Sequence, residues 1–150
     1  MYKRSGFTII EILIVVAIAL IVVGVLLSGF QNYARYQGFK AANASVALTL
    51  DQVRADAKVA LQDRNHGVKF ASDQITTYVG DVYSVGDSSN VVVTLDGVTI
   101  IPNLTNGTTE VVFGKVNGFP SATGTIQVVG NNYNGTTTFT LTEAGVVHYE

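Results

Sequence analysis

The sequence contains no cysteine. Disulfide bonds, thiolate metal sites and a cysteine nucleophile are therefore excluded. Charged residues are also scarce, at 13% of the chain, which is about half the share of a typical soluble domain. Basic residues become rarest toward the C-terminus, where Lys115 is the only one after Lys69, against seven acids. Such a surface repels a phosphate backbone, so nucleic acid is not an expected partner.

Residues suited to catalysis are equally few. The chain has two histidines, His66 and His148, and no Ser/His/Asp spacing typical of a hydrolase. It also has no phosphate-binding loop and no cluster of metal-ligand residues. We therefore expect a protein that is not an enzyme and that uses no cofactor or metal.

An apolar run occupies residues 7–27 and is interrupted only by Thr8, Glu11 and Gly24. As a helix this run would span about 32 Å, close to the thickness of a bilayer core. A cleaved secretory signal has a shorter apolar region followed by a small-residue site, which Ser28-Gly29-Phe30 resembles poorly. The run therefore predicts a transmembrane helix.

Two basic residues, Lys3 and Arg4, stand on the N-terminal side of the apolar run. Positive charge is retained on the cytoplasmic side of membranes. These two residues are therefore the expected topology signal, with the N-terminus inside and everything after Leu27 outside.

The helical pattern continues beyond the apolar run. No proline occurs between residues 30 and 64. Apolar residues recur there at spacings of four and three, at Val46, Leu50, Val53, Ala57 and Ala60. This stripe predicts that residues 28–65 continue the helix as an amphipathic half packed on a core. Asn65-His66-Gly67 is the expected stop, since Asn and Gly tolerate the left-handed conformation that ends helices.

From residue 66 onward the apolar period becomes two, which is typical of β-strands. Two hairpins are expected, one joining 68–70 to 75–79 and one joining 91–95 to 98–101 through Asp96-Gly97. Further strands are expected at 110–113, 125–129, 137–142 and 146–149. The predicted fold class is therefore α+β, a long N-terminal helix packed on an antiparallel β domain at 66–150.

Glu11 is out of place inside the apolar run, because an unpaired carboxylate is costly in lipid. No later residue of the run can pair with it, and Lys3 and Arg4 are the nearest cations. If the chain were cut after Gly6, the new amino group of Phe7 would lie four residues before Glu11, about one helical turn away.

These residues resemble a known family. Gly6-Phe7-Thr8-x-x-Glu11 followed by an apolar helix is similar to the class III prepilin motif of type IV pilins and type II secretion pseudopilins. The resemblance implies a leader at 1–6 and a transmembrane, filament-core helix at 7–27. It implies that a prepilin peptidase cuts after Gly6 and methylates Phe7. It also implies that Glu11 neutralises the Phe7 amine of a neighbouring subunit.

The resemblance further implies the partners and the location of the protein. The expected partners are prepilin peptidase, other pilin or pseudopilin subunits and the assembly platform of the inner membrane. The expected location is the cytoplasmic membrane, crossed once, and then an extracytoplasmic filament.

The kind of subunit is less closely defined. Major pilins often carry a C-terminal disulfide loop and a proline in the apolar helix, whereas this chain has no cysteine and its only prolines are Pro102 and Pro120. Its late strand, Gly-centred turn and final strand are similar to minor pilins and H-type pseudopilins. A minor subunit is therefore favoured. A major pilin and a membrane-anchored adhesin with a ligand-binding β domain are the alternatives, and exposed aromatics on the β domain would favour the adhesin.

Tyr33, Tyr36 and Phe39 follow the apolar run at helical spacing. Aromatic residues at such a place are typical of an interfacial belt at the membrane surface. They are equally suited to the interior of a filament, and the sequence leaves both interpretations open.

Overall fold

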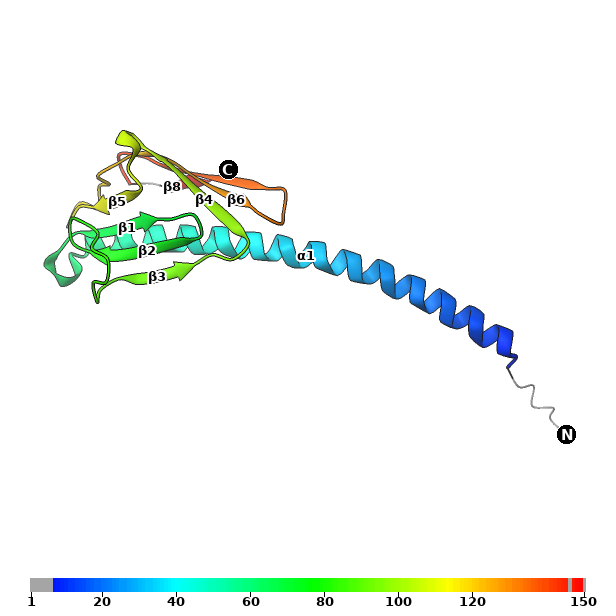
Figure 1. The fold of residues 1–150 in the computed structure, drawn as a ribbon. Helices are drawn as coiled ribbons and strands as arrows, with labels where there is room; N and C mark the ends of the chain where they lie inside the picture. Colours follow the sequence, from blue (N-terminus) through cyan, green and yellow to red (C-terminus); the bar gives the residue numbers. More distant parts are fainter. Residues whose placement is uncertain (1–6, 146, 150) are drawn as a thin grey trace. The chain divides into compact units, whose positions relative to one another are not determined.

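The computed structural model describes residues 7–145 and 147–149 (Figure 1). One long helix, α1 (Ile9–Lys58), precedes all the strands. The strands are β1 (His66–Phe70), β2 (Gln74–Val79), β3 (Val91–Thr94), β4 (Val98–Leu104), β5 (Glu110–Phe113), β6 (Gly124–Gly130), β7 (Thr136–Leu141) and β8 (Val147–Tyr149). Short 3-10 turns occur at η1 (Leu61–Asp63) and η2 (Thr105–Gly107). The chain divides into two compact units, one ending at Arg35 and one beginning at Tyr36.

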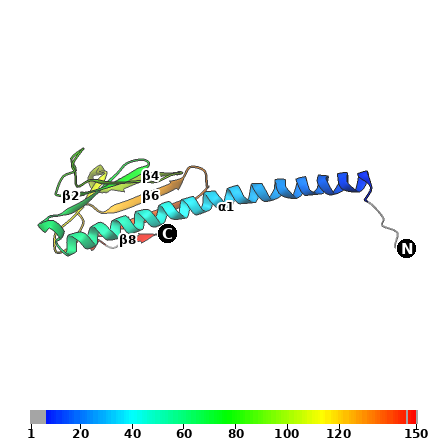
Figure 2. The same ribbon diagram turned by 90° about the horizontal axis from the view of Figure 1, so that it is seen from below.

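The strands form two four-stranded sheets in which every pairing is antiparallel. The first sheet has the order β3-β2-β1-β5 and the second β4-β6-β7-β8. Figure 2 shows both sheets lying along the same stretch of α1. The prediction of a long N-terminal helix packed on an antiparallel β domain is therefore confirmed.

One of the two expected hairpins is wrong. β3 pairs with β2 and β4 pairs with β6, so the strands on either side of Asp96-Gly97 belong to different sheets. Gly97 does take the left-handed conformation that a tight turn needs, with φ of 73°. The backbone around it bonds to other segments, since Leu95 N–H donates to Asp73 O and Asn131 N–H donates to Gly97 O. The dipeptide thus marks a turn, but distant contacts decide the partners of its strands.

The core of the second unit lies between α1 and the two sheets. Alternation along the strands places apolar side chains on the inner faces, as in β6, where Ile126 and Val128 are fully buried. The helix contributes one stripe, which consists of Ala42, Val46, Leu50, Val53 and Ala57. Four members of this stripe were expected from the spacing of apolar residues, and each of them is buried.

Helix α1 ends at Lys58, several residues before the expected stop at Asn65. Ala60 turns into the left-handed region with φ of 51°. The carbonyl of Ala57 accepts hydrogen bonds from the N–H groups of Ala60 and Val116, at 3.0 and 2.9 Å. Because Val116 comes from the loop after β5, the end of the helix is fixed by a contact that no local pattern reveals.

Asn65 instead ties three segments of the second unit together. Its side-chain amide donates to the Asp81 carboxylate, and its side-chain oxygen accepts the N–H of Lys115. Its backbone carbonyl accepts the N–H of Gly80 at 2.8 Å. The residue therefore joins the end of the helical region to the ends of β2 and β5, a role different from that of a helix stop.

Candidate functional site

The first turn of α1 holds the residues that the sequence singled out. The Thr8 hydroxyl oxygen accepts a hydrogen bond from the Glu11 N–H at 3.3 Å, and the Thr8 carbonyl accepts bonds from the N–H groups of Glu11 and Ile12. Thr8 is thus the N-cap of the helix, and Glu11 is its third residue. The pattern Thr-x-x-Glu is a capping-box signal that was present in the sequence but missed there.

Glu11 has two favourable features at this place. A carboxylate in the first turn of a helix is stabilised by the positive end of the helix dipole. Its side chain is exposed, and within the described residues it makes no hydrogen bond or ion pair. Among residues 7–145 and 147–149 the carboxylate is therefore without a partner.

Phe7 immediately precedes the cap and exposes 77% of its surface. It lies four residues before Glu11, so the two expected site residues frame the first turn of the helix. The other expected site residues, Lys3, Arg4 and Gly6, lie outside the described residues.

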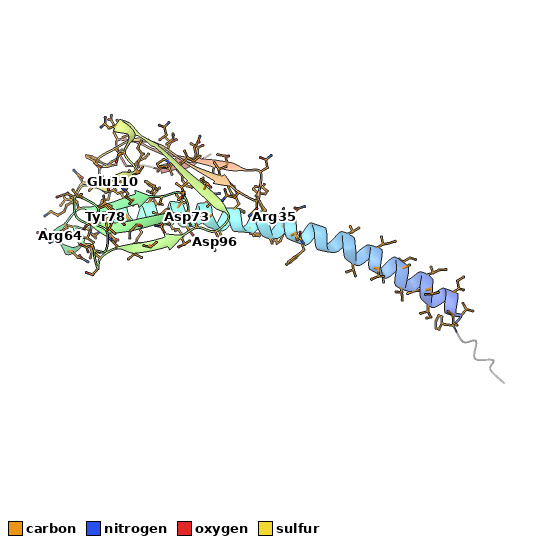
Figure 3. The ribbon with its side chains drawn as sticks, in the orientation of Figure 1. Arg35, Arg64, Asp73, Tyr78, Asp96 and Glu110 are labelled. Carbon is orange, nitrogen blue, oxygen red and sulfur yellow. The ribbon has the colours of Figure 1, made fainter. Side chains whose placement is uncertain are left out.

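The helix that follows is apolar on every side. Residues 9–25 are all exposed, and Figure 3 shows side chains standing out all along this part of α1. Among the described residues, α1 is the one helix long and apolar enough to cross a membrane. An apolar surface of this extent has to be covered by lipid or by other helices.

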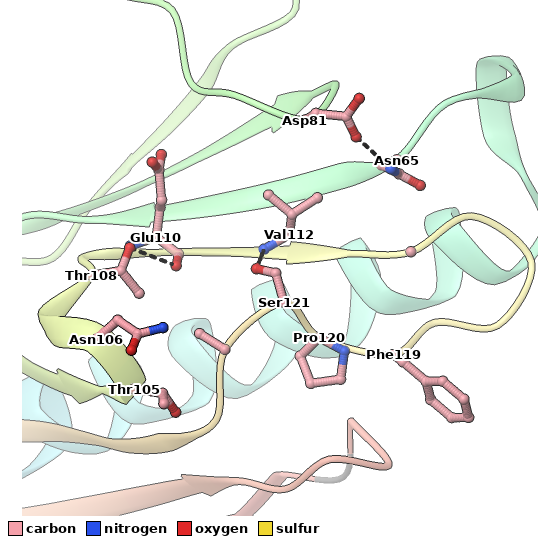
Figure 4. Close-up of a pocket in the computed structure, with 12 residues that line it drawn as sticks. Asn65, Asp81, Thr105, Asn106, Thr108, Glu110, Val112, Phe119, Pro120 and Ser121 are labelled. Carbon is pink, nitrogen blue, oxygen red and sulfur yellow. Dashed lines mark hydrogen bonds between the residues drawn. The ribbon is translucent and has the colours of Figure 1, made fainter.

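The β domain contains a polar hollow beside β5, drawn in Figure 4. Asp81 and Asn65 face each other at one side of it, while Glu110 begins β5 and Thr108 lies just before that strand (Figure 4). The Asp81 carboxylate is already bonded to Asn65, and the Thr108 hydroxyl donates to the Glu110 carbonyl at 3.2 Å. These bonds join polar groups at the edge of the hollow to one another.

Tyr78 crosses the first sheet above Gly67 of the neighbouring strand. Its hydroxyl donates to the Glu110 carboxylate at 3.4 Å, which links β2 to β5 over β1. A Cβ atom at Gly67 would lie 2.2 Å from the Tyr78 ring, so glycine is what allows this crossing. Burial raises the pKa of the Tyr78 hydroxyl, and the nearby charge of Glu110 raises it further.

Metal-ligand side chains do not cluster in the described part of the chain. No three His, Cys, Asp or Glu side chains gather there as metal ligands would. His66 is buried, and its Nε2 lies 2.9 Å from the carbonyl oxygen of Leu61, which gives it a structural role. The N-terminal helix and the surfaces of the β domain are therefore the remaining candidates for a functional site.

Comparison with known proteins agrees with this geometry. Residues 1–27 match the model of the prokaryotic N-terminal methylation motif. The fold is similar to that of the type IV minor pilin FimU of Pseudomonas aeruginosa strain PAO1, with a TM-score of 0.58 and 14% sequence identity. That likeness covers 79% of this chain and 92% of FimU. A search of curated protein sequences finds no match.

The chain therefore combines a prokaryotic N-terminal methylation motif, at the start of an exposed apolar helix, with a fold similar to that of the minor pilin FimU. The apolar N-terminal helix supports anchoring in a membrane.

Proposed function

We propose that this chain is a minor subunit of a type IV pilus or a type II secretion pseudopilus. Prepilin peptidase cuts it after Gly6 and methylates Phe7. The mature subunit waits in the cytoplasmic membrane with its N-terminus inside, and the assembly platform then adds it to the filament. The observation that carries this proposal is the exposed carboxylate of Glu11, which has no partner among the described residues, in the first turn of an exposed apolar helix.

The chemistry of assembly follows from that carboxylate. In lipid, an ionised Glu11 without a partner costs about 2–4 kcal/mol or more. The amino group released at Phe7 of a second subunit removes this cost by forming an ion pair. The same pair fixes the axial position of one subunit against the next, as a buried polar residue sets register in a coiled coil.

Glu11 also stands at the acidic position of a capping-box sequence, so a role at the start of the helix has to be separated from a role in assembly by experiment. Glutamine can take the place of glutamate in a capping box but carries no charge. If the ion pair drives assembly, E11Q and E11A are processed normally, and both lose incorporation into filaments to the same extent. The measurement is the amount of each variant in sheared filaments relative to membranes.

Thr8→Ala is the matched control, because it removes the cap and keeps the carboxylate. This variant is expected to assemble. Wild-type incorporation of E11Q together with failure of T8A would show that Glu11 acts through the helix cap, and it would overturn the proposed ion pair.

Two observations support a minor subunit over the alternatives. The protein of similar fold is described as a minor pilin. An adhesin would be favoured by a patch of exposed aromatics on the β domain, but among the described residues 66–145 Phe119 is the one aromatic residue with more than half of its surface exposed. Detection of the subunit at low copy number relative to another pilin in purified filaments would support the minor role, and equal or greater abundance would contradict it.

A further inference from the structure

The first sheet ends at a strand whose outer edge is uncovered. β3 pairs with β2, and among the described residues no second strand pairs with it (Figure 1). The Leu95 N–H donates to the Asp73 carbonyl at 2.8 Å, which fixes the phase of this ladder. Bonded and non-bonded pairs alternate along antiparallel strands, so every second residue before Leu95 bonds to β2. The N–H and C=O groups of Val92 and Thr94 therefore point away from β2.

The outer edges of β5 and β4 are covered, in contrast. In β5 the Val112 N–H donates to Ser121 Oγ at 3.0 Å, and the Val112 carbonyl accepts the Ser121 N–H at 2.7 Å. In β4 the Ile100 N–H donates to the Ser72 carbonyl at 2.8 Å, and Pro102 has no N–H to offer. The edge groups of β3 have no such cover within the described residues, and the strand carries neither a charge nor a proline. An edge of this kind is a template for another strand.

Two hollows follow one another along the line where β3 meets α1. Together they lie between residues 38–56 of α1 and residues 91–96, and we call them the β3 groove. Leu48 and Val91 border the groove and expose 69% and 59% of their surfaces, although both are apolar. Side chains alternate between the two faces of a strand. A strand added beside β3 would therefore lay every second side chain over the groove and cover these residues.

The charges around the β3 groove have one sign. Asp56 borders the groove at one end and Asp96 borders it at the other. Asp73 stands beside Asp96, since its carbonyl accepts the Leu95 N–H (Figure 3). One oxygen of Asp56 accepts the Gln52 amide at 2.8 Å, and no basic residue lines either hollow. The groove therefore attracts an extended segment that is apolar in its middle and basic at its ends.

The basic residues on this part of α1 are engaged elsewhere. Lys40 Nζ lies 5.6 Å from the centroid of the Tyr36 ring. Arg54 Nη2 donates to the Ala144 carbonyl at 2.6 Å, and the side chain of Lys58 lies beside the loop after β5. None of these cations borders the β3 groove, so its acids keep their charge for a partner.

We infer that the β3 groove binds an extended segment of a partner protein, which adds to the first sheet as a strand antiparallel to β3. The main chain of the segment bonds to Val92 and Thr94, and its alternate apolar side chains cover the exposed residues of the groove. A lysine or arginine at each end meets the acids. A second copy of this edge is disfavoured, because it would bring like charges together. The inference concerns the β domain and is independent of prepilin processing and of the ion pair proposed for Glu11.

The test uses the full-length protein in detergent and a synthetic strand. The probe is a fluorescein-labelled peptide with blocked ends and the sequence Lys-Val-Thr-Val-Thr-Val-Lys. Fluorescence anisotropy should show saturable binding, with the valines over the groove and the N–H groups of the threonines directed at β3. N-methylation of both threonines removes these donors and should weaken binding about tenfold or more. N-methylation of the valines alters only the far edge of the peptide and should preserve binding.

Thr94→Pro tests the same edge from the side of the protein. The N–H of Thr94 points away from β2, so proline leaves the ladder intact and removes a donor from the outer edge. T94P should lower the affinity for the peptide about tenfold and keep the unfolding midpoint of the wild type. Thr94→Val is the matched control, because it changes the side chain and keeps the N–H, and it should bind like the wild type. If T94P fails to fold, the two methylated peptides carry the test.

The acids of the groove are tested by a second pair of variants. Asp56→Asn removes a charge that borders the groove and should weaken binding of the lysine-flanked peptide severalfold. Asp51→Asn removes a charge on α1 that does not border the groove, and it should bind nearly as the wild type does.

Four outcomes would overturn the inference. Folded wild-type protein could fail to bind the unmethylated peptide, or it could bind all three peptides equally. Folded T94P could bind the peptide as tightly as the wild type does. Finally, the full-length protein could self-associate as its concentration rises and lose this association in T94P, which would assign the edge to a second copy of the chain.

Discussion

A leucine side chain of α1 is exposed in the first unit of the chain, whereas one in the second unit is buried. Leu50 and Leu13 both lie on α1, yet Leu50 is fully buried and Leu13 exposes 63% of its surface. The unit from Tyr36 onward covers its helical stripe with two sheets. The unit before it leaves residues 9–25 exposed on all sides. The second unit therefore has a hydrophobic core of its own, whereas the apolar side chains of residues 9–25 have no cover within the described part of the chain.

The largest expected effect comes from truncating one leucine in each unit. Leu50→Ala removes a fully buried side chain and leaves a cavity, so it should lower the free energy of unfolding of the β domain by about 2–5 kcal/mol. Leu13→Ala should leave that free energy unchanged. Denaturant unfolding of the full-length protein in detergent, followed by tyrosine fluorescence, measures both. Equal effects of the two variants would contradict the comparison of the units.

A smaller difference in stability is expected between alanine substitutions at two glycines of the second unit. Gly67→Ala places a methyl group against the Tyr78 ring and should cost about 1–3 kcal/mol of stability. Gly38→Ala lies on α1 with no neighbour within 4 Å, so helix propensity should make it neutral or stabilising by up to about 1 kcal/mol. Chemical denaturation of both variants tests the pair. A loss in G38A as large as in G67A would mean that the close approach of Tyr78 is not the cause.

The smallest expected effect concerns the pH dependence of the β domain. Because the pKa of Tyr78 is raised by folding, its contribution to stability is complete below the ordinary tyrosine pKa of about 10 and declines as pH rises above that value. Tyr78→Phe should make this alkaline decline shallower. Tyr83→Phe, which removes the hydroxyl of a tyrosine that packs against the Tyr78 ring, is the control. The measurement is the unfolding midpoint of the wild type, Y78F and Y83F from neutral to strongly alkaline pH. The same decline of the midpoint with pH in all three proteins would contradict the role given to Tyr78.

Local patterns were sufficient for the parts of the fold that depend on one segment. The spacing of Val46, Leu50, Val53 and Ala57 predicted the buried stripe, because a helix places such residues on one face whatever lies above them. Most strands were also found from their alternation. The long apolar run predicted the exposed helix of the first unit, since no other part of the chain was needed to recognise it.

Features that depend on distant contacts could not be found in this way. The helix ends at Lys58 because Val116 caps Ala57 from far along the chain. Asp96-Gly97 marked a turn but not the sheets to which its strands belong. The stacking of Tyr133 on Phe39 follows from the β6–β7 turn and its glycines. Sequence order does not reveal any of these pairings.

The candidate site likewise has features that are visible in a local sequence pattern and features that are not. The motif around Gly6, Phe7 and Glu11 is continuous in sequence, so its resemblance to prepilins was visible without a structure. Thr8 was overlooked as the N-cap although the Thr-x-x-Glu signal was present. The partner proposed for Glu11 belongs to a second subunit and therefore lies beyond any single chain.

The most direct test of the account is the intact mass of the protein purified from membranes of its native host. The account predicts a chain that lacks residues 1–6 and carries one additional methyl group, as a mature subunit beginning at Phe7 would. A full-length, unmethylated chain in cells that possess prepilin peptidase would contradict it, because Glu11 would then have no new amino group with which to pair.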